Sequence, residues 1–137
     1  MMRFPRGLPA GRKVKTPVSL IDLMPTLLDY AGEKPPVPVD GASVRPLLEG
    51  KTNKAPHAVV VENHAGRMVR DGKWKYAWYD TGEEWLFDLE ADPGETENLI
   101  GVDKSAGQVA RMRELLAFEM GRTKDSLLEE IQKSWKA

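Results

Sequence analysis

Polar side chains that could contact a ligand gather where a predicted strand ends. The six residues from Glu62 to Arg67 include Asn63, His64 and the flexible Gly66. Loops at strand ends often present ligand-contacting groups, because the scaffold positions them while the loop stays at the surface. Asn63, His64 and Arg67 are therefore candidate ligand-binding residues, although a lone loop histidine is also common where it has no such role.

Other kinds of site are excluded by the motifs. Asp88, Glu90 and Asp92 alternate like the first ligands of an EF-hand loop, but Pro93 and Leu99 stand where that loop needs Gly and Glu. The sequence has no glycine-rich phosphate loop, no H-E-x-x-H and no G-x-S-x-G. The residues alone predict neither a metal site nor a catalytic group.

Composition narrows the class of protein further. The 137 residues hold 20 Lys and Arg against 21 Asp and Glu, and no Cys. Near neutrality leaves no strong field to attract nucleic acid or an acidic membrane, and without Cys there is no disulfide framework or cysteine nucleophile. Apolar stretches are far shorter than the ~20 residues of a membrane span. We expect one compact, soluble domain with no nucleic-acid partner and no membrane contact.

The elements that position these residues follow from periodicity. Residues 16–32 predict a helix, because Leu20, Leu23 and Leu27 recur at helical spacing. A capping-box pattern precedes this segment, Gly32 ends it, and Pro25 is expected to kink or restart it. Its apolar arc is wide, so this helix needs cover from more than one side.

A proline-rich connector and then a change of period follow. Residues 33–57 read as irregular surface chain around a short turn at 45–48, and His57 within it is expected to have no functional role. Beyond the connector the apolar period becomes two. Four strands are predicted, at 58–62, 67–70, 74–79 and 85–89.

The Asp71-Gly72 pair predicts a two-residue hairpin turn between the second and third strands. A type I′ turn there pairs Arg70 with Lys73, Val69 with Trp74 and Arg67 with Tyr76. The aromatic face of this hairpin is then expected to face the core and the basic face to face solvent. Alternating bases and aromatics can also form a platform for single-stranded nucleic acid, but the amphipathic hairpin is the simpler interpretation.

The C-terminal third is expected to be helical. Val109, Met112, Leu116 and Met120 form one stripe, with Leu115 and Phe118 beside it and Gly121 at the end. Leu127, Ile131 and Trp135 mark a weaker terminal helix. A helix across the aromatic face of a four-stranded antiparallel sheet gives a two-layer α+β fold.

Several motifs resemble the sulfatase family, which is related in fold to alkaline phosphatase. TPVSLIDLMPTLLDYAG and VDGASVRPLLEG resemble its V-S-x-x-D-x-x-P-T-L and D-G-x-S-x-x-P-L-L segments. GRMVRDGKWKYAWY and WLFDLEADPGETENLI resemble its C-terminal strand pair and strand-to-loop segment. The likeness runs from residue 3 to about residue 125 in the family's order, so the chain resembles the C-terminal region of an arylsulfatase-type enzyme.

This resemblance implies an organisation. Residues 1–34 correspond to an edge strand and helix of the large α/β domain, 35–57 to a connector, 58–125 to the sheet-and-helix subdomain, and 126–137 to a terminal helix or tail. The subdomain's loops shape the substrate pocket in the family, which makes Asn63, His64 and Arg67 candidate substrate-binding residues for a sulfated sugar or aryl sulfate. Asp88, Asp92, Pro93, Glu95 and Asn98 match a signature expected to fix the exit from the last strand through turns.

The resemblance also implies what is missing. Family members use a formylglycine made from C/S-x-P-x-R and a calcium ion, and this sequence has neither that motif nor the ligand segments. We expect the chain to be inert alone, with no cofactor of its own, and to pair with the remainder of the catalytic domain or with itself through residues 16–32. A stand-alone sugar- or protein-binding module remains the alternative. Family members are often periplasmic, secreted or lysosomal, and the sequence leaves the compartment open.

Overall fold

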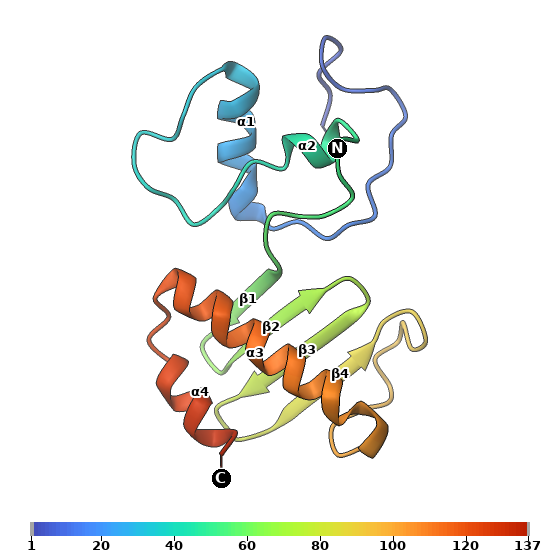
Figure 1. The fold of residues 1–137 in the computed structure, drawn as a ribbon, viewed down its shortest axis with the longest axis vertical. Coiled ribbons are helices and arrows are strands. Elements are labelled where there is room, and N and C mark those ends of the chain that lie inside the picture. Colours follow the sequence, from blue (N-terminus) through green and yellow to red (C-terminus); the bar gives the residue numbers. More distant parts are fainter. Residues whose placement is uncertain (1, 137) are drawn as a thin grey trace. The chain divides into compact units, whose positions relative to one another are not determined.

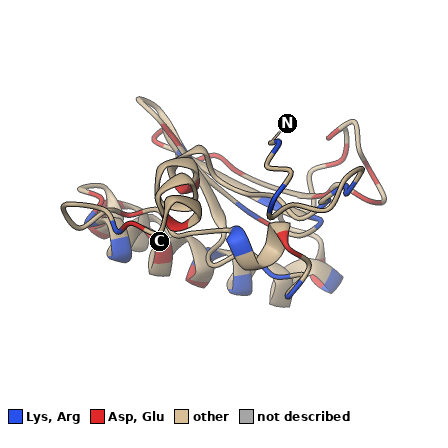
Figure 2. Cartoon of the chain, turned by 90° about the horizontal axis from the view of Figure 1, so that it is seen from above, with Lys and Arg blue, Asp and Glu red and all other residues tan. Residues whose placement is uncertain are grey.

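The computed structural model describes residues 2–136, which divide into two compact units, 2–57 and 58–136 (Figure 1). Figure 2 shows basic and acidic residues interspersed along the chain, in keeping with its near-zero net charge. The expected α+β class is confirmed by the second unit, in which an antiparallel sheet packs against helices.

The first unit is built on the helix predicted at 16–32. It begins as a short 3₁₀ helix, η1 (Leu20–Asp22), continues as α1 (Leu23–Ala31), and is followed by the single turn α2 (Arg45–Leu48). Pro25 lies in the first turn of α1, where backbone N–H groups have no intrahelical partner, so its missing N–H costs nothing. The helix therefore restarts at this proline. Residues 2–57 contain helices and loops, and no strand forms where an edge strand was expected.

Two local signals set the limits of this helix. The Ser19 N–H donates to the Asp22 carboxylate at 3.1 Å, which is half of the expected capping box. At the other end Gly32 adopts a φ of 80°, and its N–H donates to the Asp29 carbonyl. A left-handed residue is readily supplied by glycine, so the predicted stop is confirmed.

The second unit contains a four-stranded antiparallel sheet in the order β1-β2-β3-β4. Its strands are β1 (Val59–Asn63), β2 (Gly66–Asp71), β3 (Trp74–Tyr79) and β4 (Glu84–Asp88). All four predicted strands exist, each within one residue of its expected bounds. Consecutive strands lie side by side, as short hairpin connections dictate.

The predicted register of the β2–β3 hairpin is wrong by two residues. Asp71 pairs with Trp74, and Val69 pairs with Tyr76 instead of Trp74. The turn residues are therefore Gly72 and Lys73, and Gly72 alone has a positive φ, 58°, as in a type II′ turn. Because the shift is an even number of residues, every side chain stays on its predicted face.

Helices cover the aromatic face of this sheet. α3 (Ala106–Thr123) crosses the strands, and α4 (Leu128–Ser134) lies beside it (Figure 1). The core is made of side chains from the sheet and both helices: Val69, Tyr76, Trp78, Leu86, Met112, Leu116, Met120 and Ile131. The predicted stripe of α3 is thus confirmed, and the terminal stretch is an integral helix of the core.

Two details of α3 differ from expectation. The helix ends at Thr123 rather than at Gly121, with Lys124 in the left-handed conformation. Phe118 is 67% exposed, because it lies two residues, roughly 200° around the helix, from Leu116 and Met120. Its ring therefore faces solvent in the described chain rather than the core.

The apolar arc of η1 and α1 remains exposed in the described chain. Five side chains of this apolar face are between 43% and 82% exposed: Leu20, Ile21, Leu23, Met24 and Leu27. A contiguous apolar surface of this kind marks an association site. The expectation that this helix needs further cover agrees with this exposure.

Candidate functional site

The β1–β2 turn presents two of the predicted site residues at the surface. Asn63 pairs with Gly66 across the turn, and its Oδ1 accepts the Ala65 N–H at 2.9 Å. Asn63 and His64 are both exposed. This turn can therefore offer an amide NH₂ and an imidazole to a ligand.

Arg67, the third predicted residue, is committed to the protein itself. Its Nε and Nη2 donate to the two carboxylate oxygens of Asp125 at 2.5 and 3.1 Å, and Nη1 donates to the carbonyls of Asn63 and Gly66. The Arg67 and Asp125 side chains are 10% and 3% exposed. Arg67 thereby ties the backbone of the β1–β2 turn to the junction between α3 and α4.

The electrostatics of Asp125 fit this arrangement. Burial acts to raise the pKa of its carboxyl, but hydrogen bonds from Arg67 and the Leu127 N–H, together with the charge of Arg67, outweigh burial. The pKa of Asp125 therefore lies below its usual range. The carboxylate stays ionised and keeps its two bonds to the guanidinium.

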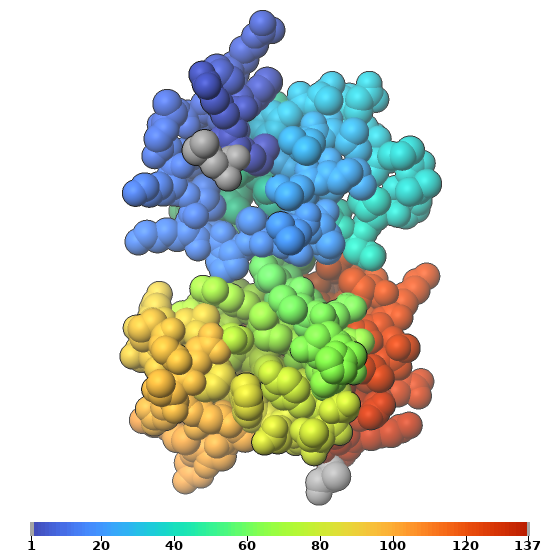
Figure 3. Space-filling model, turned by 180° about the vertical axis from the view of Figure 1, so that it is seen from behind, coloured from blue at the N-terminus to red at the C-terminus, as the bar shows by residue number. Residues whose placement is uncertain are grey.

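Two aromatic residues that the sequence analysis did not single out as site residues lie at the same end of the sheet. Gly66 pairs with Tyr79, and Trp85 pairs with Ala77, so Tyr79, Trp85 and Asn63 share the sheet face opposite α3. The rings of Tyr79 and Trp85 lie 5.0 Å apart at 56°. Figure 3 views the molecule from this side, where strand residues, green to yellow, reach the surface. We call Asn63, Tyr79 and Trp85 the outer-face group.

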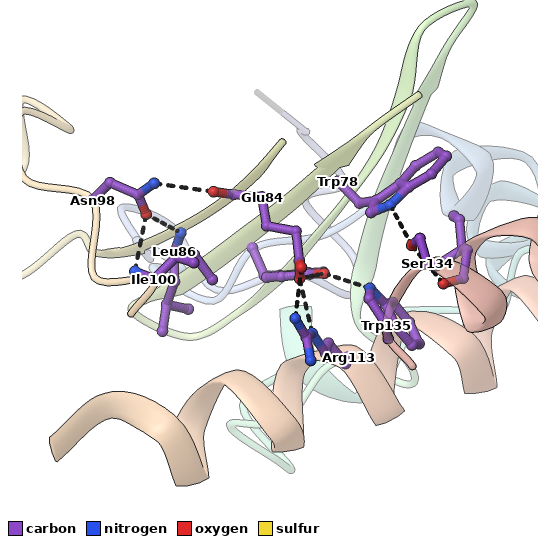
Figure 4. Close-up of polar contacts among 10 residues, drawn as sticks. Trp78, Glu84, Leu86, Asn98, Ile100, Arg113, Ser134 and Trp135 are labelled. Atoms are coloured by element: carbon purple, nitrogen blue, oxygen red, sulfur yellow. Dashed lines mark hydrogen bonds and ion pairs between the residues drawn. The ribbon is translucent and has the colours of Figure 1, made fainter. Parts of the chain in front are cut away.

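The opposite face of the sheet carries a polar network within the core (Figure 4). The Tyr76 hydroxyl donates to Glu84 at 2.5 Å and accepts from the Trp135 indole at 2.9 Å, while Arg113 donates twice to the same carboxylate. Burial first, and then Glu84, raise the pKa of Tyr76. Trp78 donates to Ser134 at 2.9 Å. These bonds fasten both helices to the sheet, and their function is structural.

The acidic signature after β4 forms turns, as its residue types predict. Asp88 accepts the N–H groups of Glu90 and Ala91, and Asp92 accepts those of Thr96 and Glu97. The backbone N–H of Glu97 contributes most to lowering the pKa of Asp92. Both carboxylates are therefore occupied in shaping the exit from β4.

A buried polar cluster in the first unit escaped the sequence analysis. The Asp22 carboxylate is 1% exposed and accepts the N–H groups of Ser19 and Ala42, with His57 Nε2 at 2.8 Å. Thr26 donates to the Asp22 carbonyl at 2.6 Å. His57 thus has a structural role, holding the end of the connector to η1. The two residues are 35 positions apart, so no local pattern could have revealed the pair.

The described chain offers no ligand set for a cation. Among residues 2–136, no three Asp, Glu, His or Cys side chains lie close enough together to hold a metal ion. These residues do not fit the calcium ion that the resemblance implies for complete sulfatases. No helix in that range is both long and apolar enough to cross a bilayer.

Comparison with known proteins places this arrangement in a family. The sequence profile described as N-sulphoglucosamine sulphohydrolase, C-terminal, matches residues 1–121. A Delta 4,5-hexuronate-2-O-sulfatase of Bacteroides thetaiotaomicron is 40% identical over 77% of the chain and 24% of its own length. An N-acetylglucosamine-6-O-sulfatase of the same species is 32% identical over 99% of the chain and 25% of its own length.

Solved structures agree with the sequence comparisons. A structure described as in complex with its substrate D-glucosamine-2-N,6-O-disulfate has a TM-score of 0.80 and 27% identity, over 90% of this chain and 28% of the other. The fold is that of the C-terminal region of a sulfatase. The chain belongs to the N-sulphoglucosamine sulphohydrolase C-terminal family and spans about a quarter of the length of these relatives.

Proposed function

We propose that this chain serves as the C-terminal part of an enzyme that hydrolyses sulfate esters of carbohydrates. In this proposal the nucleophile and calcium ligands belong to a catalytic portion that corresponds to the other three quarters of the relatives. The chain supports that portion and shapes the substrate pocket. The relatives' names, which specify sulfated sugars, support a carbohydrate sulfate as the substrate class.

The apolar face of η1 and α1 is the observation that carries the proposal. Fully burying one Leu, Ile or Met side chain stabilises a protein by about 1.5–3 kcal/mol, so five of them represent a sum comparable to a whole domain's stability of about 5–15 kcal/mol. We infer that the catalytic portion covers this face. In that setting the exposed side chains become part of a shared core.

The β1–β2 turn supplies the substrate contacts in this proposal. Asn63 and His64 present their polar groups to the sugar, and Arg67 holds the turn in shape through Asp125. None of the three is a catalytic residue. They select and orient the alcohol side of the ester, while sulfate transfer depends on groups outside this sequence.

The test begins with the DNA upstream of the codon for residue 1. An in-frame segment encoding C/S-x-P-x-R and metal ligands is expected there, and the complete polypeptide should hydrolyse N-acetylglucosamine 6-sulfate or 4-nitrophenyl sulfate in the presence of calcium. The purified 137-residue chain should not. Turnover by the chain alone that survives repurification, or no sulfatase activity in the complete polypeptide, would overturn the proposal.

Variants of the apolar face sharpen this test. Leu20→Asp with Leu27→Asp in the complete polypeptide should abolish soluble, active enzyme, because charges would replace two buried contacts. Val37→Asp is the matched control, since Val37 is 62% exposed but lies outside the apolar face. Equal activity in the double variant and the control would show that another element covers the catalytic portion.

A further inference from the structure

We propose that the outer-face group, Asn63, Tyr79 and Trp85, together with His64, forms a stacking platform for a pyranose ring. The sulfated nature of the sugar rests on the proposed function, whereas the platform rests on the geometry of the second unit alone. Tyr79 and Trp85 lie in the strands of the family-like motifs, but neither of them was assigned a role at the candidate site from the sequence. They extend it from the turn onto the face of the sheet.

Packing around Gly66 brings an aromatic ring next to the turn. A Cβ atom at this position would lie 2.4 Å from the Trp78 carbonyl oxygen and 3.0 Å from Cδ1 of Tyr79. The absence of a side chain therefore leaves room for the Tyr79 ring beside Gly66 of β2, the residue that pairs with Asn63. Trp85 continues the aromatic surface on the next strand and is 39% exposed.

The chemistry of this surface matches a sugar. Aromatic faces carry a negative quadrupole, which attracts the partly positive C–H groups on one side of a pyranose. On the rings and in the adjoining β1–β2 turn, three polar groups make no hydrogen bond within residues 2–136: the Trp85 indole N–H, the Asn63 amide NH₂ and the His64 imidazole. Apolar rings bordered by a few convergent polar groups are the usual lining of a small-ligand site.

These same polar groups favour a sugar over a covering polypeptide. An apolar protein surface packed on the rings would exclude water from the neighbouring donors, and each buried donor without a partner costs about 1–3 kcal/mol. A sugar brings hydroxyl acceptors at the edge of its ring while its C–H face covers the aromatic surface. The structural neighbour solved with D-glucosamine-2-N,6-O-disulfate contains a pyranose ligand, which agrees with this assignment.

The platform can be tested on the 137-residue chain by ¹H–¹⁵N NMR titration. The probes are D-glucosamine-2-N,6-O-disulfate and unsulfated N-acetylglucosamine. We expect both to shift the signals of residues 63–66, 79 and 85, including the Trp85 indole, because stacking depends on the pyranose ring that both sugars share and not on the sulfate groups. No saturable shift with either sugar, or shifts centred elsewhere in the chain, would overturn the inference.

Variants separate stacking from general packing. Trp85→Leu keeps an apolar side chain but removes the π face, so affinity should fall about fivefold or more, as expected when an aromatic contact is lost. Trp85→Phe should bind more tightly than Trp85→Leu. Phe118→Ala is the matched control, because Phe118 is an exposed aromatic residue on α3. Thermal unfolding of each variant checks that it is folded, and equal binding by Trp85→Leu and wild type would refute stacking.

Failure of this inference is distinguishable from failure of the proposed function. A complete polypeptide that hydrolyses sulfate esters while its Trp85→Leu variant keeps the same KM would refute the platform and leave the function intact. Sugar binding at the platform in a polypeptide without sulfatase activity would refute the proposed function and leave a sugar-binding module.

Discussion

Breaking the Arg67–Asp125 pair should destabilise the second unit strongly. Arg67→Met keeps most of the side chain's apolar stem but leaves the Asp125 carboxylate, 3% exposed, with the Leu127 N–H at 2.9 Å as its remaining hydrogen-bond donor. Removing one partner of a buried ion pair costs about 3–5 kcal/mol, and Arg67 at 10% exposure places this pair near the lower end. For a unit of this size each kcal/mol shifts Tm by about 4–8 °C, so Arg67→Met should lower it by about 12 °C or more.

The assay is thermal unfolding followed by tryptophan fluorescence, with two comparison variants. Arg111→Met removes an ion pair to Asp71 whose side chains are 51% and 44% exposed, so it should cost less than about 1 kcal/mol. Arg67→Met combined with Asp125→Leu should recover much of the loss, because replacing both partners of a buried pair by apolar groups is often nearly neutral. Equal losses in Arg67→Met and Arg111→Met would refute this reasoning.

Three further outcomes are expected. Gly32→Ala should destabilise the first unit by about 1 kcal/mol, seen by urea unfolding, because alanine is strained at a φ of 80° although no neighbouring atom blocks its Cβ. Tyr76→Phe should cost about 1 kcal/mol or more by the same assay, because it removes the acceptor of the partly buried Trp135 indole; unchanged stability would show that the network adds nothing. Acid should destabilise the second unit: the pKa values of Asp92 and Asp125 lie below their usual range, so their contribution is complete above about pH 4 and is lost as the pH falls through the folded values. Asp125→Asn should flatten this loss in a circular-dichroism titration.

Local patterns were sufficient to predict the elements and the faces of the sheet. Alternation placed all four strands, and helical spacing found α1, α3 and α4. The Asp71-Gly72 signal located the β2–β3 turn but not which two residues occupy its centre. The predicted register was wrong by two residues, so every side chain kept its predicted face of the sheet. An error of one residue would have moved every side chain to the opposite face.

Local sequence patterns did not predict contacts between residues far apart in the chain. Arg67 was assigned to a ligand from its loop position, yet its guanidinium meets Asp125, 58 residues away. The packing of α4 on the core likewise depends on distant residues of β3. The Tyr76 hydroxyl accepts a hydrogen bond from Trp135, and the Trp78 indole donates one to Ser134. Such pairs are set by tertiary packing, which the spacing of a few neighbours does not encode.

The sequence predicted only part of the candidate site, because the remaining residues are brought there by pairing between strands. The exposure of Asn63 and His64 follows from a turn at a strand end. Tyr79 and Trp85 join them because β1 to β4 align in register, and this alignment requires pairing across three strands. The alternation of residues along β3 and β4 could have revealed these two aromatic residues, since it puts Tyr79 and Trp85 on the sheet face away from the core.

The position of α4 has a consequence for how the protein is made. Ile131, fully buried, and Trp135, bonded to Tyr76, lie after all four strands in the chain. During synthesis the strands emerge first, and their aromatic face stays exposed to water until the codons of α4 have been translated. A stop codon before residue 131 would remove this cover and leave a chain with exposed aromatic side chains, which chaperones and proteases recognise.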